Sequence, residues 1–408
     1  MRLKDVAFVN LRTLDESTKG DYKFRYIDIS SVSADNGIIL GDEITFQEAP
    51  SRARRIVKKD DVLVSTVRTY LRAIANIDWD AKDIIASTGF AVYTPNNKII
   101  PRFLAYSIKS TKAINQICSN SKGVSYPAIQ AQVLSSIEIP YWDLKRQEAI
   151  AAYLDKECEK IGRKIELLER KADVYSRLRR SLINRAVTRG LDPNVSLKPS
   201  GNNWIGDIPQ HWGYERVEKY FHNNTSYNKD FQYKHAFKFF KGTIIHKDET
   251  FEEDEYQDTY EKYTIVEPND IIINGLNLNY DLKSMRVGKV TENGIITSAY
   301  IVLRPYNNVC SDFFNYLFKA FDYRKFFHGM GKGIRLTLSF NELRYFEIPI
   351  PPIDEQKKIA AYLDEKCAKI DAILEKINTE VELLKELKRS LINEVVTGQR
   401  AIDTELHS

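Results

Sequence analysis

The feature that most constrains this chain is a helical phrase that occurs twice. The sequence "AIAAYLDKECEKIG" occupies residues 149–162, and "KIAAYLDEKCAKID" occupies residues 358–371. When the chain is shifted by 209 residues, 22 of the 51 positions from 138 to 188 match those from 347 to 397 without a gap. The matches include both E-I-P triplets and the cysteines Cys158 and Cys367, which a bias toward helix-forming residues would not reproduce. We interpret the chain as an internal duplication.

The similarity continues upstream of each helix, although it is weaker there. The segment "DDVLVSTVR" (60–68) resembles "NDIIINGLN" (269–277), and "KGV" at Lys122 resembles "KGI" at Lys332. This order predicts a variable domain followed by a long helix, twice over. The expected boundaries are a first domain at 1–141, a first helix at 142–190, a linker and second domain at 191–351, and a second helix with its tail at 352–408.

Apolar residues in both copies recur at alternating steps of three and four, from Ile150 to Ala186 and from Ile359 to Val395. This pattern predicts one long helix in each copy, with a single apolar stripe. Each helix has about 45 residues and is therefore roughly 65–70 Å long.

The helix boundaries are indicated by capping residues. Proline precedes each helix, Asp143 or Asp354 can serve as the N-cap, and Gly190 and Gly398 follow the two ends.

A lone helix of this length with one apolar stripe needs a partner. The other copy has the matching length and period, so we expect an antiparallel, intramolecular coiled coil with approximate two-fold symmetry between the halves. A coiled coil between two chains is the alternative. The expected core of the helix pair comprises Ile150, Leu154, Cys158, Ile161, Ile359, Leu363, Cys367 and Ile370.

The two variable domains are expected to be α+β. Short β-like runs separated by Gly, Asn and Pro turns precede a helical stretch in each domain, at 101–117 and at 311–327. The predicted fold is therefore two mixed α/β domains that are separated and joined by two long helices.

Composition excludes several classes of protein. The 408 residues exceed one ordinary core, no apolar run is long enough to span a bilayer, and the start of the chain has no apolar signal region. Four dispersed cysteines without a C-x-x-C pair favour a reduced, cytoplasmic protein with no zinc ribbon. The sequence has no metal-ligand spacing and no catalytic or nucleotide-binding motif. Outside the two long helices, we find no set of polar residues that occurs in both halves. We therefore expect neither a catalytic site nor a bound metal.

The formal net charge of +4 is compatible with nucleic acid binding, and local clustering is more informative. Several basic and aromatic residues stand beside expected turns, where cations neutralise phosphates and arginine reaches base edges. A solvated basic surface balanced by acids is the alternative for each cluster. The candidate DNA-binding residues are Arg52, Arg54, Arg55, Arg68, Tyr70, Arg72, Lys122, Tyr126, Arg286, Lys289, Lys332 and Arg335.

The sequence resembles the specificity subunits of type I restriction–modification systems over essentially its whole length. The segment "IPIPPIDEQKKIAAYLD" (348–364) looks like the family's pattern at the start of its long helix, and "KPSGNNWIGDIPQHWGYERV" (198–217) is similar to the opening of a recognition domain. Two departures occur in the first half: "PYW" at 140–142 replaces the double proline, and "WIGDIPQHW" has no counterpart.

The resemblance implies a non-catalytic subunit whose two target-recognition domains each bind one half of a bipartite DNA site. The helices would set the spacer between the halves and dock two methyltransferase subunits, and restriction–translocase subunits would join them. S-adenosylmethionine, ATP and Mg²⁺ would belong to those partners, so this chain would bind no cofactor itself. We expect the methyltransferase at the outer helix face with Glu365, Lys366 and Lys369. A stand-alone sequence-specific DNA-binding regulator, a pure coiled-coil scaffold and an enzyme with a divergent site are the alternatives.

Overall fold

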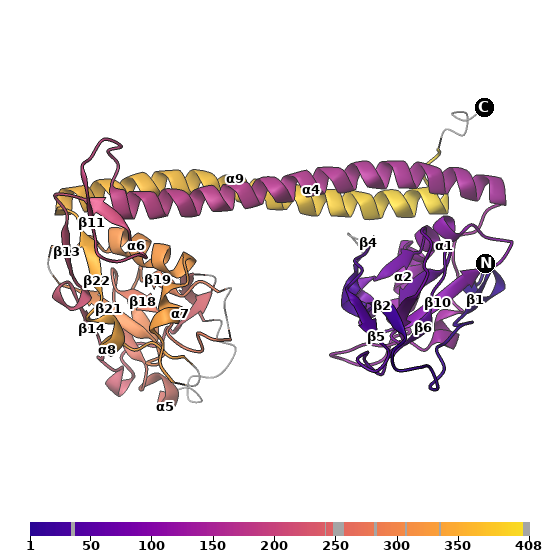
Figure 1. Ribbon diagram of the computed structural model, residues 1–408, viewed down its shortest axis with the longest axis horizontal. Helices are drawn as coiled ribbons and strands as arrows, with labels where there is room; N and C mark the ends of the chain where they lie inside the picture. Colours follow the sequence, from indigo (N-terminus) through magenta and orange to yellow (C-terminus); the bar gives the residue numbers. More distant parts are fainter. Residues whose placement is uncertain are drawn as a thin grey trace. The chain divides into compact units, whose positions relative to one another are not determined.

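The computed structural model describes residues 1–33, 37–240, 242–247, 257–280, 284–306, 308–333 and 336–402. The chain forms two compact units, and each contains one domain with parts of both long helices (Figure 1). The first unit comprises residues 1–170 and the chain from Ile377 onward, and the second comprises residues 171–376. Helix α4 (Leu144–Arg189) and helix α9 (Ile353–Thr397) therefore each run through both units.

The first domain contains two principal sheets and three short helices. One sheet has the antiparallel order β1-β10-β7-β8, and the other has the order β5-β2-β9-β6 with β2 and β9 parallel. The elements are β1 (Ala7–Val9), β2 (Lys23–Ile27), β3 (Val32–Ser33), β4 (Gly37–Ile38), β5 (Glu43–Thr45), β6 (Ala53–Ile56), β7 (Val62–Ser65), β8 (Ile74–Asn76), β9 (Ile84–Ser87), β10 (Phe90–Pro95), α1 (Pro101–Ile108), α2 (Thr111–Ser119) and α3 (Ala131–Leu134).

The second domain repeats the first sheet as β14-β21-β18-β19 and adds smaller strand pairs. The elements are β11 (Leu197–Pro199), β12 (Asp207–Pro209), β13 (Gly213–Arg216), β14 (Phe221–Asn223), β15 (Phe237–Phe240), β16 (Thr243–His246), β17 (Thr264–Val266), β18 (Ile271–Ile273), β19 (Val287–Lys289), β20 (Gly294–Ile296), β21 (Ile301–Pro305), β22 (Glu347–Ile350), α5 (Gln257–Tyr260), α6 (Ser311–Tyr323), α7 (Phe326–Met330) and α8 (Phe340–Leu343). The expected α+β class of both domains is confirmed.

The duplication is also visible in strained backbone angles that recur at equivalent positions of the two domains. Asp60 and Asn269 have φ angles of 71° and 78°, and Arg68 and Asn277 have 48° and 51°. Each pair is related by the 209-residue shift. Residues other than glycine rarely adopt this left-handed region, so its recurrence indicates that the two domains share one chain path around β7 and β18.

Two details of the expected helices differ from the structure. The stretch 101–117 is broken between α1 and α2, because the Ser110 side chain accepts a hydrogen bond from the Ala113 amide and caps a new helix. The stretch 311–327 is broken likewise, at Lys325, whose φ is 59°. Asp143 caps α4 through the Arg146 amide at 3.0 Å, whereas Asp354 lies inside the first turn of α9 and is not its N-cap.

Within each unit the two long helices are antiparallel. In the first unit the Trp142 indole donates to the Val396 carbonyl at 2.9 Å, and Lys164 pairs with Glu380 at 2.8 Å further along. In the second unit Arg179 pairs with Asp371 at 2.9 Å.

The residues predicted for the helix-pair core are buried, apart from the half-buried Ile161. They do not pack only between the helices, however. Ile150, Leu154 and Cys158 share one cluster with α1, α2 and the end of α9, and Ile359, Leu363 and Cys367 share another with α6 and the end of α4. The apolar stripe thus packs against a neighbouring helix and a domain simultaneously.

A buried glutamine at the start of each long helix ties that helix to its domain. The Gln147 side chain accepts from the Ile100 amide at 2.8 Å and donates to the Lys98 and Trp142 carbonyls. Its counterpart Gln356 accepts from the Cys310 amide at 3.1 Å and donates to a carbonyl just before α9. Buried backbone groups of this kind require partners, so both glutamines stabilise the domain–helix contact.

A second repeated contact involves a tyrosine that the sequence analysis did not find. Tyr106 donates to Asp155 at 2.8 Å, and Tyr316 donates to Asp364 at 2.7 Å. Burial raises the pKa of both phenols well above their ordinary value, because the tyrosinate form would lose its hydration. A polar constellation is therefore shared between the halves, contrary to expectation, and it joins domain to helix.

We predict that Gln147→Ala lowers the free energy of unfolding by about 1–3 kcal/mol, because buried backbone groups lose their partners. Denaturant unfolding followed by circular dichroism measures this change. The control is Lys145→Ala, two residues earlier and fully on the surface. If both variants lost the same stability, the glutamine would have no special role.

Candidate DNA interface

The first candidate surface is built by two segments that lie against each other. The segment 66–72 follows β7, and the segment 121–130 links α2 to α3. The Arg68 amide donates to the Pro127 carbonyl at 2.7 Å, and the Ile129 amide donates to the Thr66 carbonyl at 2.8 Å. These backbone bonds hold both loops in place whichever side chains they carry.

Five candidate residues from distant parts of the sequence meet on this surface. The Arg68 guanidinium lies 4.8 Å from the centre of the Tyr126 ring, a cation–π contact. Tyr70, Arg72 and Lys122 are exposed beside them. Arg68 and Arg72 both have positive φ angles, 48° and 52°. Strained residues of this kind cluster at functional sites, so their place on an exposed basic surface supports a binding role.

Two exposed apolar side chains on the same surface were missed by the sequence analysis. Val124 is fully exposed at the tip of its loop, and Leu71 is 48% exposed between Tyr70 and Arg72. Apolar side chains contact the methyl group of thymine in the major groove. In the sequence, the exposure of Val124 was indicated only by its position directly after Gly123. In the structure, the φ of 108° at Gly123 marks a tight turn.

The cluster at 52–55 is divided by the structure. Arg52 is exposed, and its carbonyl accepts from the Thr88 amide, in the turn that also contacts Thr66. Arg54 lies over the Phe46 ring at 4.8 Å, and Arg55 donates to Thr13 at 3.2 Å. Burial lowers the pKa of Arg55. Arg52 is thus the member of this cluster that adjoins the first surface.

The second domain repeats this construction with different side chains. The Leu338 amide donates to the Gly275 carbonyl at 2.9 Å, as Ile129 does to Thr66, and Lys332 and Thr337 exchange the two backbone bonds that Lys122 and Ala128 exchange. The loops approach so closely that a Cβ atom on Gly275 would lie 2.3 Å from the Leu338 carbonyl oxygen. Glycine is therefore required there.

The candidate DNA-binding residues of the second domain differ in their exposure and ion pairing. Lys332 is exposed and 3.4 Å from Glu342, and the exposed Tyr280 stands on the adjoining loop. Lys289 is largely buried and pairs with Asp312. Arg335 lies outside the described residues.

Arg286 requires a correction. Only 2% of its surface is exposed, its guanidinium donates to the Asn274 and Leu276 carbonyls, and its amide donates to Asp322. It supports the loop after β18 from inside the domain and does not present a charge to solvent. Its charge is evident from the sequence, whereas the direction of its side chain is not.

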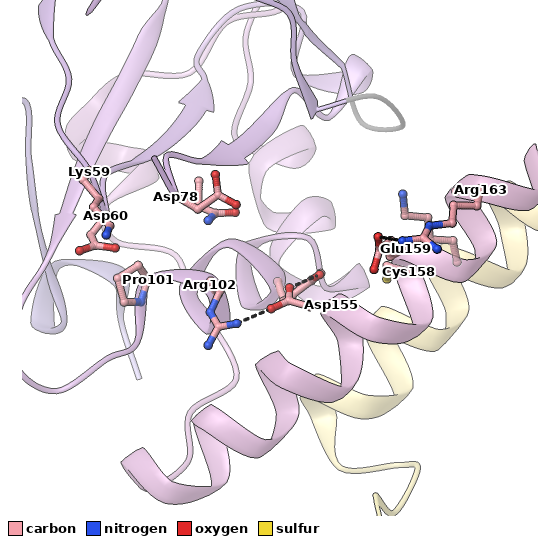
Figure 2. A pocket seen from close by; sticks show the side chains of 13 residues that line it. Lys59, Asp60, Asp78, Pro101, Arg102, Asp155, Cys158, Glu159 and Arg163 are labelled. Atoms are coloured by element: carbon pink, nitrogen blue, oxygen red, sulfur yellow. Dashed lines mark hydrogen bonds and ion pairs between the residues drawn. The ribbon is translucent and has the colours of Figure 1, made fainter. Parts of the chain in front are cut away.

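A groove of about 820 Å³ lies between the first domain and α4. Figure 2 shows that its charged side chains include Arg102 beside Asp155 and Glu159 beside Arg163. Arg102 pairs with Asp155 at 2.6 Å, and Arg163 pairs with Glu159. The four groups therefore satisfy one another.

The described part of the chain contains no group of histidine, cysteine or acidic side chains suited to hold a metal ion. Its helices include none that is both long and apolar enough to cross a membrane.

Comparison with known proteins places this fold. The family model described as "Type I restriction modification DNA specificity domain" matches residues 1–171 and 206–383. The chain is 23% identical over 379 residues to the putative type I restriction enzyme MjaX specificity subunit of Methanocaldococcus jannaschii, covering 88% of this chain and 82% of that protein. It is 22% identical over 338 residues to the MjaVIII specificity subunit of the same organism, covering 78% and 74%.

A solved structure shows the same fold across the whole chain. A chain from a study of complex assembly and conformational transition of the type I R-M system superposes with a TM-score of 0.68 at 20% identity, covering 98% of this chain and 97% of that one. The family model, matched twice in one chain, agrees with the duplicated domains and helices described above. The chain belongs to the type I restriction–modification DNA specificity family, as a specificity subunit.

Proposed function

We propose that each recognition domain reads one half of a bipartite DNA site through the pair of loops described above. The observation that carries this proposal is that both domains build the same loop pair with the same backbone bonds and present different side chains on it. A shared frame with divergent side chains suits two different half-sites. The first surface comprises Arg52, Arg68, Tyr70, Leu71, Arg72, Lys122, Val124 and Tyr126; the second includes Tyr280 and Lys332.

The side chains of the first surface supply both kinds of contact that sequence-specific binding needs. Lysine and arginine neutralise phosphates and position the protein, while arginine reads guanine and apolar groups contact thymine. The stacking of Arg68 on Tyr126 restricts the guanidinium before DNA arrives, which lowers the entropic cost of binding.

We propose that the paired helices fix the spacer between the half-sites. Helix α4 has 46 residues and is therefore about 69 Å long, which corresponds to about two turns of DNA. Helices paired along a buried stripe resist bending, so the spacer should have one length.

Two methyltransferase subunits are the partners that we propose for the helix surface. Val174 and Leu178 on α4 are exposed, and the equivalent Leu383 and Leu387 on α9 are exposed as well. One apolar pair, presented once in each unit at the same repeat position, suits two copies of one partner. The expected charged face is less suitable, because Glu365 pairs with both Lys366 and Lys369.

In this role the chain itself is not an enzyme and binds no cofactor. Catalysis, S-adenosylmethionine, ATP and Mg²⁺ belong to the methyltransferase and restriction subunits, and the complex acts in the cytoplasm, on double-stranded DNA. A stand-alone DNA-binding regulator is the alternative, and the repeated apolar pair argues against it, since a regulator needs no second copy of a docking surface.

We predict that Arg68→Ala weakens binding to the cognate duplex roughly 5- to 150-fold, from the loss of about 1–3 kcal/mol of base discrimination. Fluorescence anisotropy of the assembled methyltransferase on labelled duplexes measures this loss. The control is Lys145→Ala, an exposed cation on α4 that belongs to neither proposed surface. Equal affinity of the Arg68 and Lys145 variants at moderate salt would remove the loop surface from the proposal.

We predict that inserting seven residues at equivalent points of both α4 and α9 lengthens the spacer by about three base pairs. Seven residues add about 10 Å of helix and preserve the period of the apolar stripe. Sequencing of methylated sites measures the spacer. An unchanged spacer in a folded, active complex would contradict the ruler role.

Substituting one apolar pair should remove one partner. Leu383→Glu with Leu387→Glu is expected to leave a complex with a single methyltransferase subunit, and adding Val174→Glu and Leu178→Glu should leave none. Native mass spectrometry counts the subunits, and Leu197→Glu, exposed on β11, is the control. Retention of both subunits in the quadruple variant would place the docking surface elsewhere.

A further inference from the structure

The first unit contains a smaller, strongly basic cavity that the proposed function does not use. Its volume is about 180 Å³, room for about six water molecules at about 30 Å³ each. It opens among the loop after β7, helices α1 and α2, and the two long helices. Half of its ten lining residues are basic and none is acidic: Arg72, Lys109, Lys385, Lys388 and Arg389 line it with Gly37, Tyr106, Ile114, Cys158 and Ile392.

The protein itself compensates only part of this positive charge. Lys385 pairs with Glu382 at 3.1 Å, and the Lys109 ammonium lies 5.8 Å from the centre of the Tyr106 ring. Among the described residues, no carboxylate lies within ion-pair distance of Arg72, Lys388 or Arg389.

Two neighbouring groups on α4, Cys158 and Asp155, do not add a usable negative charge. Burial raises the pKa of Cys158, so its thiol stays neutral. Asp155 is already held by Arg102 at 2.6 Å and by the Tyr106 hydroxyl. Gathering cations without counter-charges is unfavourable, and an anion in the cavity would relieve that repulsion.

The equivalent place in the second unit shows how the same positions are neutralised. Arg179 occupies the repeat position of Lys388, and it pairs with Asp371 at 2.9 Å and with the Tyr323 hydroxyl. Arg180, at the position of Arg389, lies 5.4 Å from the centre of the Tyr323 ring.

Both of those partners are missing from the first unit. Gly162 stands at the position of Asp371 by the 209-residue shift, and Ala113 stands at the position of Tyr323 by the offset of 210 that relates Tyr106 to Tyr316. The first unit therefore has the cations of this site but lacks the carboxylate and the aromatic ring that interact with them in the second unit.

We propose that this cavity binds a phosphate group, held by Lys388, Arg389 and Arg72. Three cations around one small cavity match the charge and the several acceptor oxygens of phosphate. Two sources have this chemistry: a free phosphate compound and a phosphate of the DNA backbone. Arg72 also belongs to the first loop surface, which makes the backbone a natural source, although the site itself stands independently of the proposed function.

The test uses inorganic phosphate as the probe on the full chain. Phosphate is expected to bind in isothermal titration at constant ionic strength and to raise the melting temperature relative to chloride. Lys388→Ala should weaken phosphate binding about tenfold or more, because it removes a charge-assisted hydrogen bond. Lys145→Ala, the surface control, should bind phosphate as the parent chain does.

A second variant supplies the missing acid without removing a cation. Gly162→Asp places a carboxylate where Asp371 stands in the other unit, and a Cβ atom at Gly162 meets nothing within 4 Å. This variant is expected to fold normally and to lose phosphate binding. The proposal would be wrong if the Gly162 and Lys388 variants both bound phosphate as tightly as the parent chain. It would also be wrong if the parent chain bound no phosphate and both variants bound duplex DNA as tightly as the parent chain.

The salt dependence of duplex binding distinguishes the two sources. If a backbone phosphate occupies the cavity, Lys388→Ala should reduce the slope of log affinity against log salt by about 0.9. If free phosphate is the ligand, the slope stays unchanged while phosphate binding is lost. The Arg68→Ala variant tests the proposed function separately, since Arg68 does not line this cavity.

Discussion

The structure depends on the burial of one apolar stripe along each long helix. A helix of about 45 residues gains little from intrinsic propensity and must cover its stripe. In each unit the stripe is covered from two sides, by the antiparallel segment of the other helix and by the helices of one domain. The domains are thus part of the helix core, and the orientation of each domain on its helix follows from that shared packing.

The polar contacts at the same junctions make that orientation specific. Apolar packing alone allows a domain to slide along its helix. A buried glutamine and a buried tyrosine–aspartate pair, in contrast, form all their hydrogen bonds in only one geometry. Gln147 with Tyr106, and Gln356 with Tyr316, provide this in the two units. The ruler role that we propose needs such fixed junctions, because rotation of a domain on its helix would change the spacing.

The two loop surfaces that we propose to read DNA follow the opposite rule, with fixed backbone and changing side chains. One backbone bond between the two loops, and one reciprocal pair within the second loop, recur in both domains, while Arg68 in one domain corresponds to Asn277 in the other. Because the frame does not depend on the exposed side chains, they can change without loss of the fold. This separation is what the proposed recognition of two half-sites by one duplicated domain requires.

Much of this architecture could be predicted from the sequence, because periodicity and repetition are local signals. The lengths of α4 and α9 and the glycines at their ends follow from spacing alone. The burial of Arg286 and the exposure of Leu178 and Leu387 could not be predicted, since they depend on which face a neighbouring element covers. The partnership of Tyr106 with Asp155 was likewise hidden, because it joins residues 49 positions apart.

Sequencing of the methylated sites in a host that carries this chain with its methyltransferase subunit tests the proposed function most directly. We expect a bipartite motif with two different halves and a single spacer length, and exchanging the loops of the first domain should alter one half only. A contiguous motif, or a change in both halves after that exchange, would contradict the proposed function.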